Sequence, residues 1–227
     1  MHSQSNPVSF PPKIASAYVK PLAVVFFVIW FAAVLFGFYS LTVYELRPGE
    51  KGKATVDFPS GSTIFRSPGK PTLIMFVHPH CPCTRASVGE LAKIMCRAQG
   101  RVNATVMFLK PAGFSQDWTK SDLWSAVTAI PGVRAAMDID GAEAKRFGCV
   151  TSGHTLLYDS YGHLAFSGGI TSSRGHHGDN DGMESVVAFL LDGKGTTKDT
   201  NVYGCSLGNG PNPDEPMACL KIARPTP

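Results

Sequence analysis

Two cysteines separated by one proline, Cys81 and Cys83, stand in the stretch HPHCPCTRAS, directly after His78 and His80. Thiols at this spacing support two kinds of chemistry. Cysteine thiolates exchange electrons with other thiols and disulfides, and together with histidine they bind soft metal ions. A third possibility, that both cysteines only pack in a core, is disfavoured by the adjacent histidines.

The cysteines lie between a predicted strand and a predicted helix. The apolar run PTLIMFVH indicates a buried strand, and RASVGELAKIMCRAQ carries apolar residues at helical spacing. We therefore expect Cys81 at the helix N-cap and Pro82 at the first helical position, where proline is favoured. Free backbone N–H groups and the helix dipole stabilise an anion there. Cys81 is thus predicted to be a solvent-reachable nucleophile with a lowered pKa, which charge on His78 or His80 would lower further.

The spacing of the two cysteines limits how they can pair. Residues two apart on a helix do not face each other, so a Cys81–Cys83 disulfide requires Cys81 at or before the helix start. Its short ring predicts a strained bond, and strained disulfides are easily reduced.

The elements around the cysteines alternate between strand and helix. From Pro71 onward the pattern predicts the order β-α-β-α-β-α-β-β-α, which indicates an α/β domain with a mixed sheet covered on both faces. We place this domain at residues 70–195. The Pro- and Gly-containing segment 47–69 is predicted as a linker, and residues 196–227 as an irregular C-terminal tail.

An apolar segment precedes the linker. No charged residue lies between Lys20 and Glu45, and the 23 residues 22–44 would span roughly 34 Å as a helix, enough for a bilayer. No signal-peptide cleavage pattern follows, and a core helix this long would carry a polar face. Residues 21–46 are therefore predicted as a single transmembrane anchor. The flanking charges favour residues 1–20 as a cytoplasmic tail and a periplasmic or otherwise extracytoplasmic domain.

Composition narrows the classes of function. A 44% hydrophobic and 17% charged chain is not a disordered tail, and the net charge of +4 is not clustered, which argues against nucleic-acid binding. Six cysteines fit an oxidising compartment. No phosphate-binding loop, dinucleotide fingerprint or haem-attachment motif occurs.

The element order, with a cysteine motif at the first strand-to-helix junction, resembles the thioredoxin fold over roughly residues 56–195. More narrowly, HPHCPCTRAS and SGGITSSRGHHGDN resemble the membrane-anchored thioredoxin-like family often labelled RedB. The resemblance implies a three-layer α/β/α fold and extracytoplasmic thiol or metal redox chemistry. The chain departs from the thioredoxin pattern at Thr84, which holds the usual place of the second cysteine, and at His154, which holds that of a cis-proline.

His154 supports the alternative interpretation. The segment GHTLLYDSYGH partly resembles the copper-handling Sco proteins, which implies Cys81, Cys83 and His154 as copper ligands. Two thiolates and an imidazole suit copper, and soft sulfur favours Cu(I). Sco proteins, however, separate their cysteines by three residues. A strand-end histidine without a ligand role is equally compatible with this segment.

The resemblance to the thioredoxin fold implies that the loop SGGITSSRGHHGDNDG lies near the active-site face, with Arg174 as the charge of a docking rim for a partner or an anionic ligand. The alternative is a solvated loop before a helix capped by Asn180 or Asp181. A metal site at His176 and His177 is the weaker prediction.

The other cysteines have separate predictions. Cys96 and Cys149 are expected to pack in the core. Cys205 and Cys219 are predicted to form a structural disulfide; the alternative is Cys205 folding back as a resolving thiol for Cys81.

Three functions follow from these residues. The first is a membrane-tethered thiol–disulfide oxidoreductase in which Cys81 attacks a substrate disulfide and Cys83 resolves the intermediate, with a thiol or disulfide protein as partner and no cofactor. The second is a copper-binding chaperone that delivers copper to a receiving protein. The third, a purely structural adaptor, is disfavoured by the cysteine motif. We expect the first.

Overall fold

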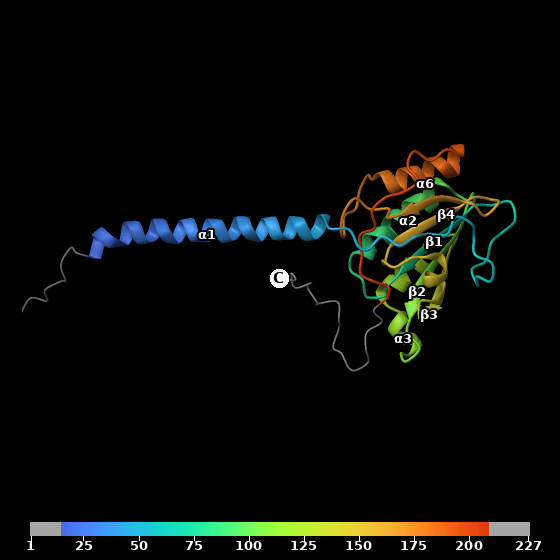
Figure 1. The fold of residues 1–227 in the computed structure, drawn as a ribbon, viewed down its shortest axis with the longest axis horizontal. Coiled ribbons are helices and arrows are strands. Elements are labelled where there is room, and N and C mark those ends of the chain that lie inside the picture. Colours follow the sequence, from blue (N-terminus) through green and yellow to red (C-terminus); the bar gives the residue numbers. More distant parts are fainter. Residues whose placement is uncertain (1–14, 209–227) are drawn as a thin grey trace, which may run out of the picture. The chain divides into compact units, whose positions relative to one another are not determined.

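The computed structural model describes residues 15–208 of the chain. The chain divides into two compact units at residues 44 and 45, a long helix and an α/β domain (Figure 1). Each unit is described by itself.

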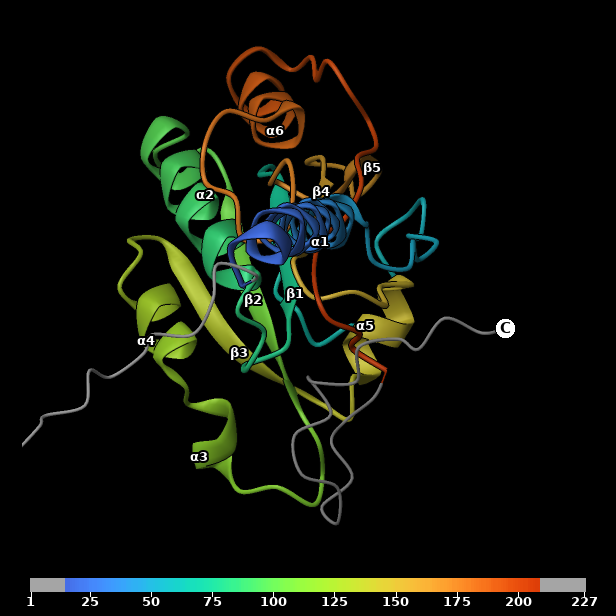
Figure 2. The same ribbon diagram turned by 90° about the vertical axis from the view of Figure 1, so that its left-hand side faces the viewer.

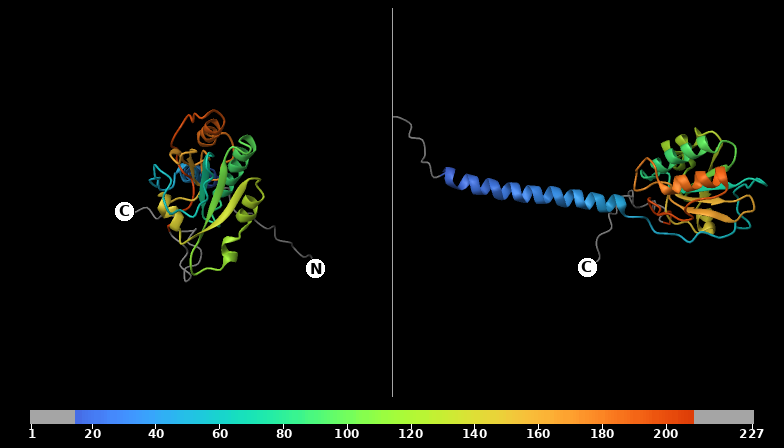
Figure 3. Two further views of the ribbon diagram at one scale, coloured as in Figure 1. Left: turned by 90° about the vertical axis from the view of Figure 1, so that its right-hand side faces the viewer. Right: turned by 90° about the horizontal axis from the view of Figure 1, so that it is seen from above.

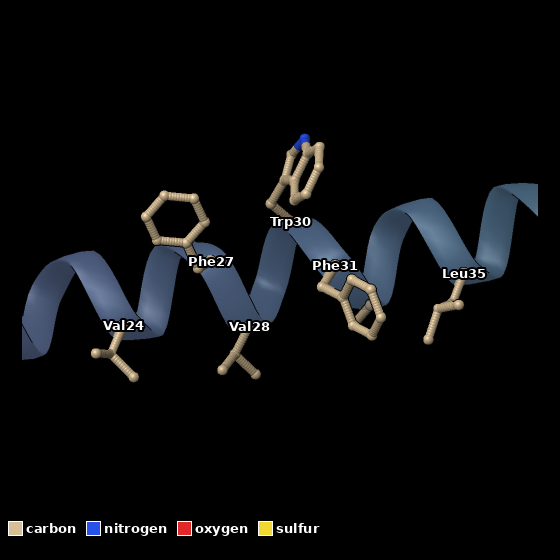
Figure 4. A pocket seen from close by; sticks show the side chains of 7 residues that line it. Val24, Phe27, Val28, Trp30, Phe31 and Leu35 are labelled. Atoms are coloured by element: carbon tan, nitrogen blue, oxygen red, sulfur yellow. The ribbon is translucent and has the colours of Figure 1, made fainter.

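The N-terminal unit is the helix α1 (Ala15–Leu46). Its segment Lys20–Leu46 has 27 residues and a mean hydropathy of 2.5, and none of its most apolar window is buried. Figure 4 shows apolar side chains such as Phe27 and Trp30 projecting from it. At about 1.5 Å per residue this helix is long enough to cross a membrane. Helices of this kind serve as membrane anchors or as signal segments.

A five-stranded mixed sheet forms the centre of the domain, in the order β3-β2-β1-β4-β5. The strands β1, β2 and β3 are parallel, whereas β4 runs antiparallel to β1, and β5 antiparallel to β4. All six residues of β1 are buried, because helices cover both faces of the sheet. The strands are β1 (Thr72–Val77), β2 (Asn103–Lys110), β3 (Val133–Ile139), β4 (His154–Tyr158) and β5 (Leu164–Gly168).

The helices form the two outer layers. One face carries α2 (Thr84–Arg97), α4 (Asp122–Thr128) and α6 (Asp181–Asp192), and α2 and α6 lie side by side (Figures 2 and 3). The other face carries α5 (Ala142–Phe147). A short helix, α3 (Gln116–Thr119), precedes α4 and was not expected from the sequence. The predicted three-layer thioredoxin-like α/β/α class is confirmed.

Two segments without regular structure pack on the domain. Within residues 47–69, Ile64 is buried in the core beside α5, and Asp57 forms a β-bridge with His163. Within residues 196–208, Val202 and Leu207 are buried. Cys219 lies outside the described residues, so the Cys205–Cys219 disulfide stays a prediction.

Candidate active site

The cysteine motif connects β1 to α2, as predicted, but the helix starts later than expected. Thr84 N–H donates to the Cys81 carbonyl at 3.2 Å, and Arg85 N–H donates to the Pro82 carbonyl at 3.3 Å. These bonds span three residues rather than four, so the chain enters α2 through a 3₁₀-like turn. The N-cap is therefore Cys83, and Cys81 lies at the head of the turn that precedes the helix.

The Cys81 side chain is buried, with 3% of its surface exposed, which corrects the expectation that it is directly reachable from solvent. The segment that follows β5 and α6 in the sequence covers it. The Cys205 backbone N–H points at the Cys81 sulfur, with 3.4 Å between the nitrogen and Sγ. The cover is thus a chain segment that itself carries a thiol.

Hydrogen bonds hold the pKa of the Cys81 thiol far below its ordinary value. The largest contribution comes from the Cys205 side chain and the next from the Cys83 side chain. The Thr84 hydroxyl and the Cys205 backbone N–H add to them, while burial acts in the opposite direction. Sulfur that accepts this many hydrogen bonds is stabilised as a thiolate. The lowered pKa predicted for Cys81 thus arises mainly from neighbouring thiols.

Cys83 takes the complementary role. Its hydrogen bond to Cys81 raises the pKa of the Cys83 thiol, and burial raises it further. The Arg174 guanidinium acts in the opposite direction through a hydrogen bond and its charge. Cys83 therefore stays protonated at neutral pH and donates to the Cys81 thiolate. The two cysteines have unequal proton affinities, as a nucleophile and its supporting donor require.

Thr84 and Ser152 form a buried pair of hydroxyls beside Cys81. Their oxygens share a hydrogen bond of 2.7 Å, and Ser152 Oγ accepts the His78 backbone N–H at 2.8 Å. Ser152 immediately precedes Gly153 and β4, so this pair joins the cysteine turn to the start of β4. Ser152 was not found from the sequence, because a serine in a loop carries no distinctive signal.

The two histidines of the motif contact an aromatic residue that sequence reasoning also missed. Both rings lie edge-on to Trp118 of α3, with centroids 5.6 Å away for His78 and 4.8 Å for His80. Burial lowers the pKa of His78, which disfavours the charged form that would have lowered the pKa of Cys81 further. His78 Nδ1 accepts the His80 backbone N–H at 3.2 Å. His78 therefore acts as a neutral packing residue.

Arg174 lies at the site, as the expected docking rim requires. Besides Cys83, its guanidinium donates to the Gly204 carbonyl at 2.9 Å and to the Arg47 carbonyl at 3.2 Å. The same loop is fixed to α2 by the buried Glu90, whose Oε1 accepts the Gly178 backbone N–H at 3.0 Å. Hydrogen bonds at Arg174 and at Gly178 therefore hold this loop against the domain.

The remaining predictions for this loop have separate outcomes. Asn180 caps α6, with its side-chain oxygen accepting the Met183 N–H at 2.8 Å. His177 Nδ1 lies 3.9 Å from Glu90 Oε1, and no metal-binding group forms around His176 or His177 within residues 15–208.

His154 does not join the cysteines. Its side chain is 1% exposed, and Nε2 shares a hydrogen bond of 2.9 Å with Ser167 Oγ. Burial lowers the pKa of His154 to about 4. Side chains alternate along a strand, so His154 shares its face of β4 with Leu156, which packs in the α5 layer. Helix α2, which follows the cysteines, packs on the opposite face.

The copper interpretation therefore does not fit this donor set. Among the described residues, no three His, Cys, Asp or Glu side chains converge in a way that could hold a metal ion. Cys81, Cys83 and His154 are not an assembled ligand set.

The other two cysteines differ from each other. Cys149 is buried beside α5, as expected, and burial raises the pKa of its thiol. Cys96 is exposed, contrary to expectation. The buried stripe of α2 includes Leu91, Ile94 and Met95, and Cys96 falls outside it, because each helical residue turns about 100° from the last.

No protein-family model matches this sequence, and no curated protein matches it. Several solved structures are similar to this chain, and two of them match it over most of their own length. A hypothetical protein from Sinorhizobium meliloti is 22% identical, with 71% of this chain and 94% of that chain covered and a TM-score of 0.52. An uncharacterized conserved protein from Geobacillus kaustophilus is 19% identical, with 74% and 94% covered and a TM-score of 0.53.

A secreted disulfide oxidoreductase from Mycobacterium tuberculosis is similar over 43% of this chain and 67% of its own, with 19% identity and a TM-score of 0.35. The likenesses to the Sinorhizobium meliloti and Geobacillus kaustophilus proteins show the fold alone. They do not confirm the narrower resemblance to the RedB family or to Sco proteins.

Proposed function

We propose that this chain is a thiol–disulfide oxidoreductase held at a membrane by α1, with Cys81 as its nucleophile. One observation carries the proposal: at the turn that enters α2, the Cys205 backbone N–H lies 3.4 Å from the Cys81 sulfur, and neighbouring thiol and hydroxyl groups lower the pKa of the Cys81 thiol. A core cysteine needs no such set of donors. A thiolate that must attack a disulfide at neutral pH does.

The chemistry follows from this arrangement. The Cys81 thiolate attacks one sulfur of a substrate disulfide, the S–S bond breaks, and the other substrate sulfur leaves as a thiolate. The Cys83 thiol and the Thr84 hydroxyl stabilise the Cys81 thiolate before the attack. A second protein thiol then attacks Cys81 and releases the substrate as a thiol. The partner is a protein or small molecule with a thiol or a disulfide.

Catalysis tests the proposal directly. The reduced full chain, purified in a non-ionic detergent, is mixed with oxidised glutathione, and glutathione release is followed against free dithiothreitol at equal thiol concentration. Faster release by the protein supports the proposal, and the same or a slower rate contradicts it. This activity would support thiol–disulfide exchange in general. It would not identify the partner of a narrower role of the RedB type.

The proposal also includes an extracytoplasmic domain and a cytoplasmic N-terminus. Lys13 and Lys20, which precede the apolar segment 21–46, favour that orientation. Thiol–disulfide exchange with structural disulfides takes place mainly in oxidising compartments.

Labelling of Cys96 tests the orientation, because this cysteine is exposed on α2. We expect a membrane-impermeant maleimide to label Cys96 in cells whose cytoplasmic membrane is sealed, and the Cys96→Ser variant to lose that label. Mass spectrometry of the labelled chain assigns the site. Labelling of Cys96 only after the cytoplasmic membrane is permeabilised would place the domain in the cytoplasm.

A further inference from the structure

We infer that Cys205 is the resolving cysteine of this site, closing a disulfide with Cys81 during turnover. The inference rests on the proposed function and names the second reacting thiol within it. The sequence offers Cys83 for this role by its proximity, whereas the folded chain brings Cys205 to the same sulfur from a position 124 residues further along.

The segment that carries Cys205, residues 198–207, is called the strap here. Backbone hydrogen bonds hold it against the domain along its length. Its first part pairs with β5, where Ser167 N–H donates to the Lys198 carbonyl at 2.9 Å. Its last part pairs with the residues before β4: Ser152 N–H donates to the Cys205 carbonyl at 2.8 Å, and Leu207 N–H donates to the Val150 carbonyl at 2.8 Å. In Figure 2 this orange-to-red segment runs from β5 toward α5.

The residue before Cys205 shows how closely the strap approaches the domain. A Cβ atom at Gly204 would lie 1.9 Å from the Ser152 carbonyl oxygen, so only glycine fits there without a shift of the backbone. Arg174 holds the Gly204 carbonyl at 2.9 Å. The position of Cys205 is therefore fixed by its backbone hydrogen bond with Ser152 and by the hydrogen bond from Arg174 to the preceding residue, Gly204.

Cys205 meets Cys81 through both its backbone and its side chain. The backbone nitrogen lies 3.4 Å from Cys81 Sγ. The Cys205 side chain also makes the largest contribution to the lowered pKa of the Cys81 thiol. Cys205 is partly exposed while Cys81 is buried, so a substrate in solvent reaches Cys205 more readily than Cys81. A thiol held this close is placed to attack Cys81 Sγ when Cys81 carries the substrate as a mixed disulfide.

Cys83 is less suited to closing the disulfide. Its backbone is helical, with φ −65° and ψ −32°, and it lies only two residues from Cys81. A bond between them would close a short ring and distort the turn that enters α2. Cys205 comes from a separate segment, so the strap can close on Cys81 while the helix stays intact. Cys83 then remains the thiol that supports the Cys81 thiolate.

The reaction balances with these two residues. The Cys81 thiolate attacks a substrate disulfide RS–SR, forms a mixed disulfide and releases RS⁻. The Cys205 thiol passes its proton to the released thiolate, and its sulfur attacks Cys81 Sγ, which releases the second RS⁻. Two electrons have moved from the Cys81 and Cys205 sulfurs to the substrate. Run in reverse, the same steps oxidise a substrate dithiol.

Disulfide mapping tests the inference. Trypsin leaves Cys81 and Cys83 on one peptide and Cys205 and Cys219 on another, because no Lys or Arg that it cleaves lies within either pair. The full chain in detergent is reduced, oxidised with oxidised glutathione, quenched in acid with N-ethylmaleimide, digested and sequenced by mass spectrometry. We expect the two peptides to be joined through Cys81 and Cys205, with Cys83 alkylated. A disulfide within either peptide, Cys81–Cys83 or Cys205–Cys219, would overturn the inference.

Variants separate this inference from the proposed function. Cys205→Ser should retain glutathione on Cys81 as a mixed disulfide at least tenfold longer than the wild type, while Cys83→Ser should still form the joined peptides. Cys96→Ser is the matched control and should behave as the wild type. If Cys205→Ser releases glutathione as fast as the wild type, the inference fails and the function stands. If Cys81 of the wild type is still found as the alkylated thiol after oxidation, it has not reacted with glutathione, and the proposed function itself fails.

Discussion

Replacing Cys81 with serine should lower the rate of thiol–disulfide exchange by at least about 10³-fold, because a serine hydroxyl is not ionised at neutral pH and does not attack disulfides. The two side chains are nearly the same size, so the turn before α2 should keep its shape. The measurement is glutathione release from oxidised glutathione by the full chain in detergent. The other five cysteines remain in this variant, and any residual rate measures what they contribute.

The matched control is Cys96→Ser, the same substitution at an exposed position of α2 with no role in the site. It should retain the wild-type rate. A Cys81→Ser variant that keeps more than a tenth of the wild-type activity would contradict the role of Cys81. Comparing the thermal melting of both variants with that of the wild type separates a chemical loss from unfolding.

The stability that Cys81 contributes should depend strongly on pH. Hydrogen bonds from Cys205, Cys83 and Thr84 hold its pKa in the folded chain far below the ordinary value. A depressed pKa means that the folded state binds fewer protons than the unfolded state between the two pKa values. The contribution is therefore fully present above the unfolded pKa of about 8.5, and it is lost as pH falls toward the folded pKa.

The expected size follows from proton linkage. The difference in unfolding free energy between the reduced wild type and Cys81→Ser should grow by about 1.4 kcal/mol per pH unit, or roughly 4 kcal/mol from pH 5 to pH 8. Urea unfolding of both full chains in the same detergent, with the thiols kept reduced, measures it. Most other titrating groups are shared by both chains and cancel in the difference. A difference that stays constant over this range would mean that Cys81 is an ordinary thiol.

Much of the fold could be predicted because its signals are local and periodic. The apolar run before Cys81 and the helical stripe after it place the cysteines between β1 and α2. The apolar segment 21–46 similarly indicates α1 from composition and length alone. These signals need no knowledge of distant contacts, since each element fixes its own pattern of buried residues.

The cover over Cys81 could not be predicted in the same way. The strap has no helical or alternating pattern, and its position depends on backbone pairing with Val150 and Ser152, which leaves no mark in side-chain type. Solvent exposure of Cys81 was therefore predicted wrongly. The sequence did suggest Cys205 as an alternative partner of Cys81, but without the pairing there was no means of choosing it.

His154 shows a different limit. His154 and Leu156 are two residues apart, so the sequence shows that their side chains lie on the same face of β4. Which helical layer covers that face depends on the whole topology. Only the complete sheet order shows that α2 packs on the other side. Trp118 was missed for a related reason, because the short helix α3 has too few residues to show a period.

The proposed chemistry requires Cys81 to be a thiolate in the folded, reduced protein. The most direct measurement is the absorbance of thiolate near 240 nm, recorded for the reduced wild type and for Cys81→Ser from pH 9 down to pH 4 and subtracted. We expect a difference signal of one thiolate that persists unchanged well below pH 7. A signal that disappears with a midpoint near the ordinary cysteine pKa of about 8.5 would contradict it.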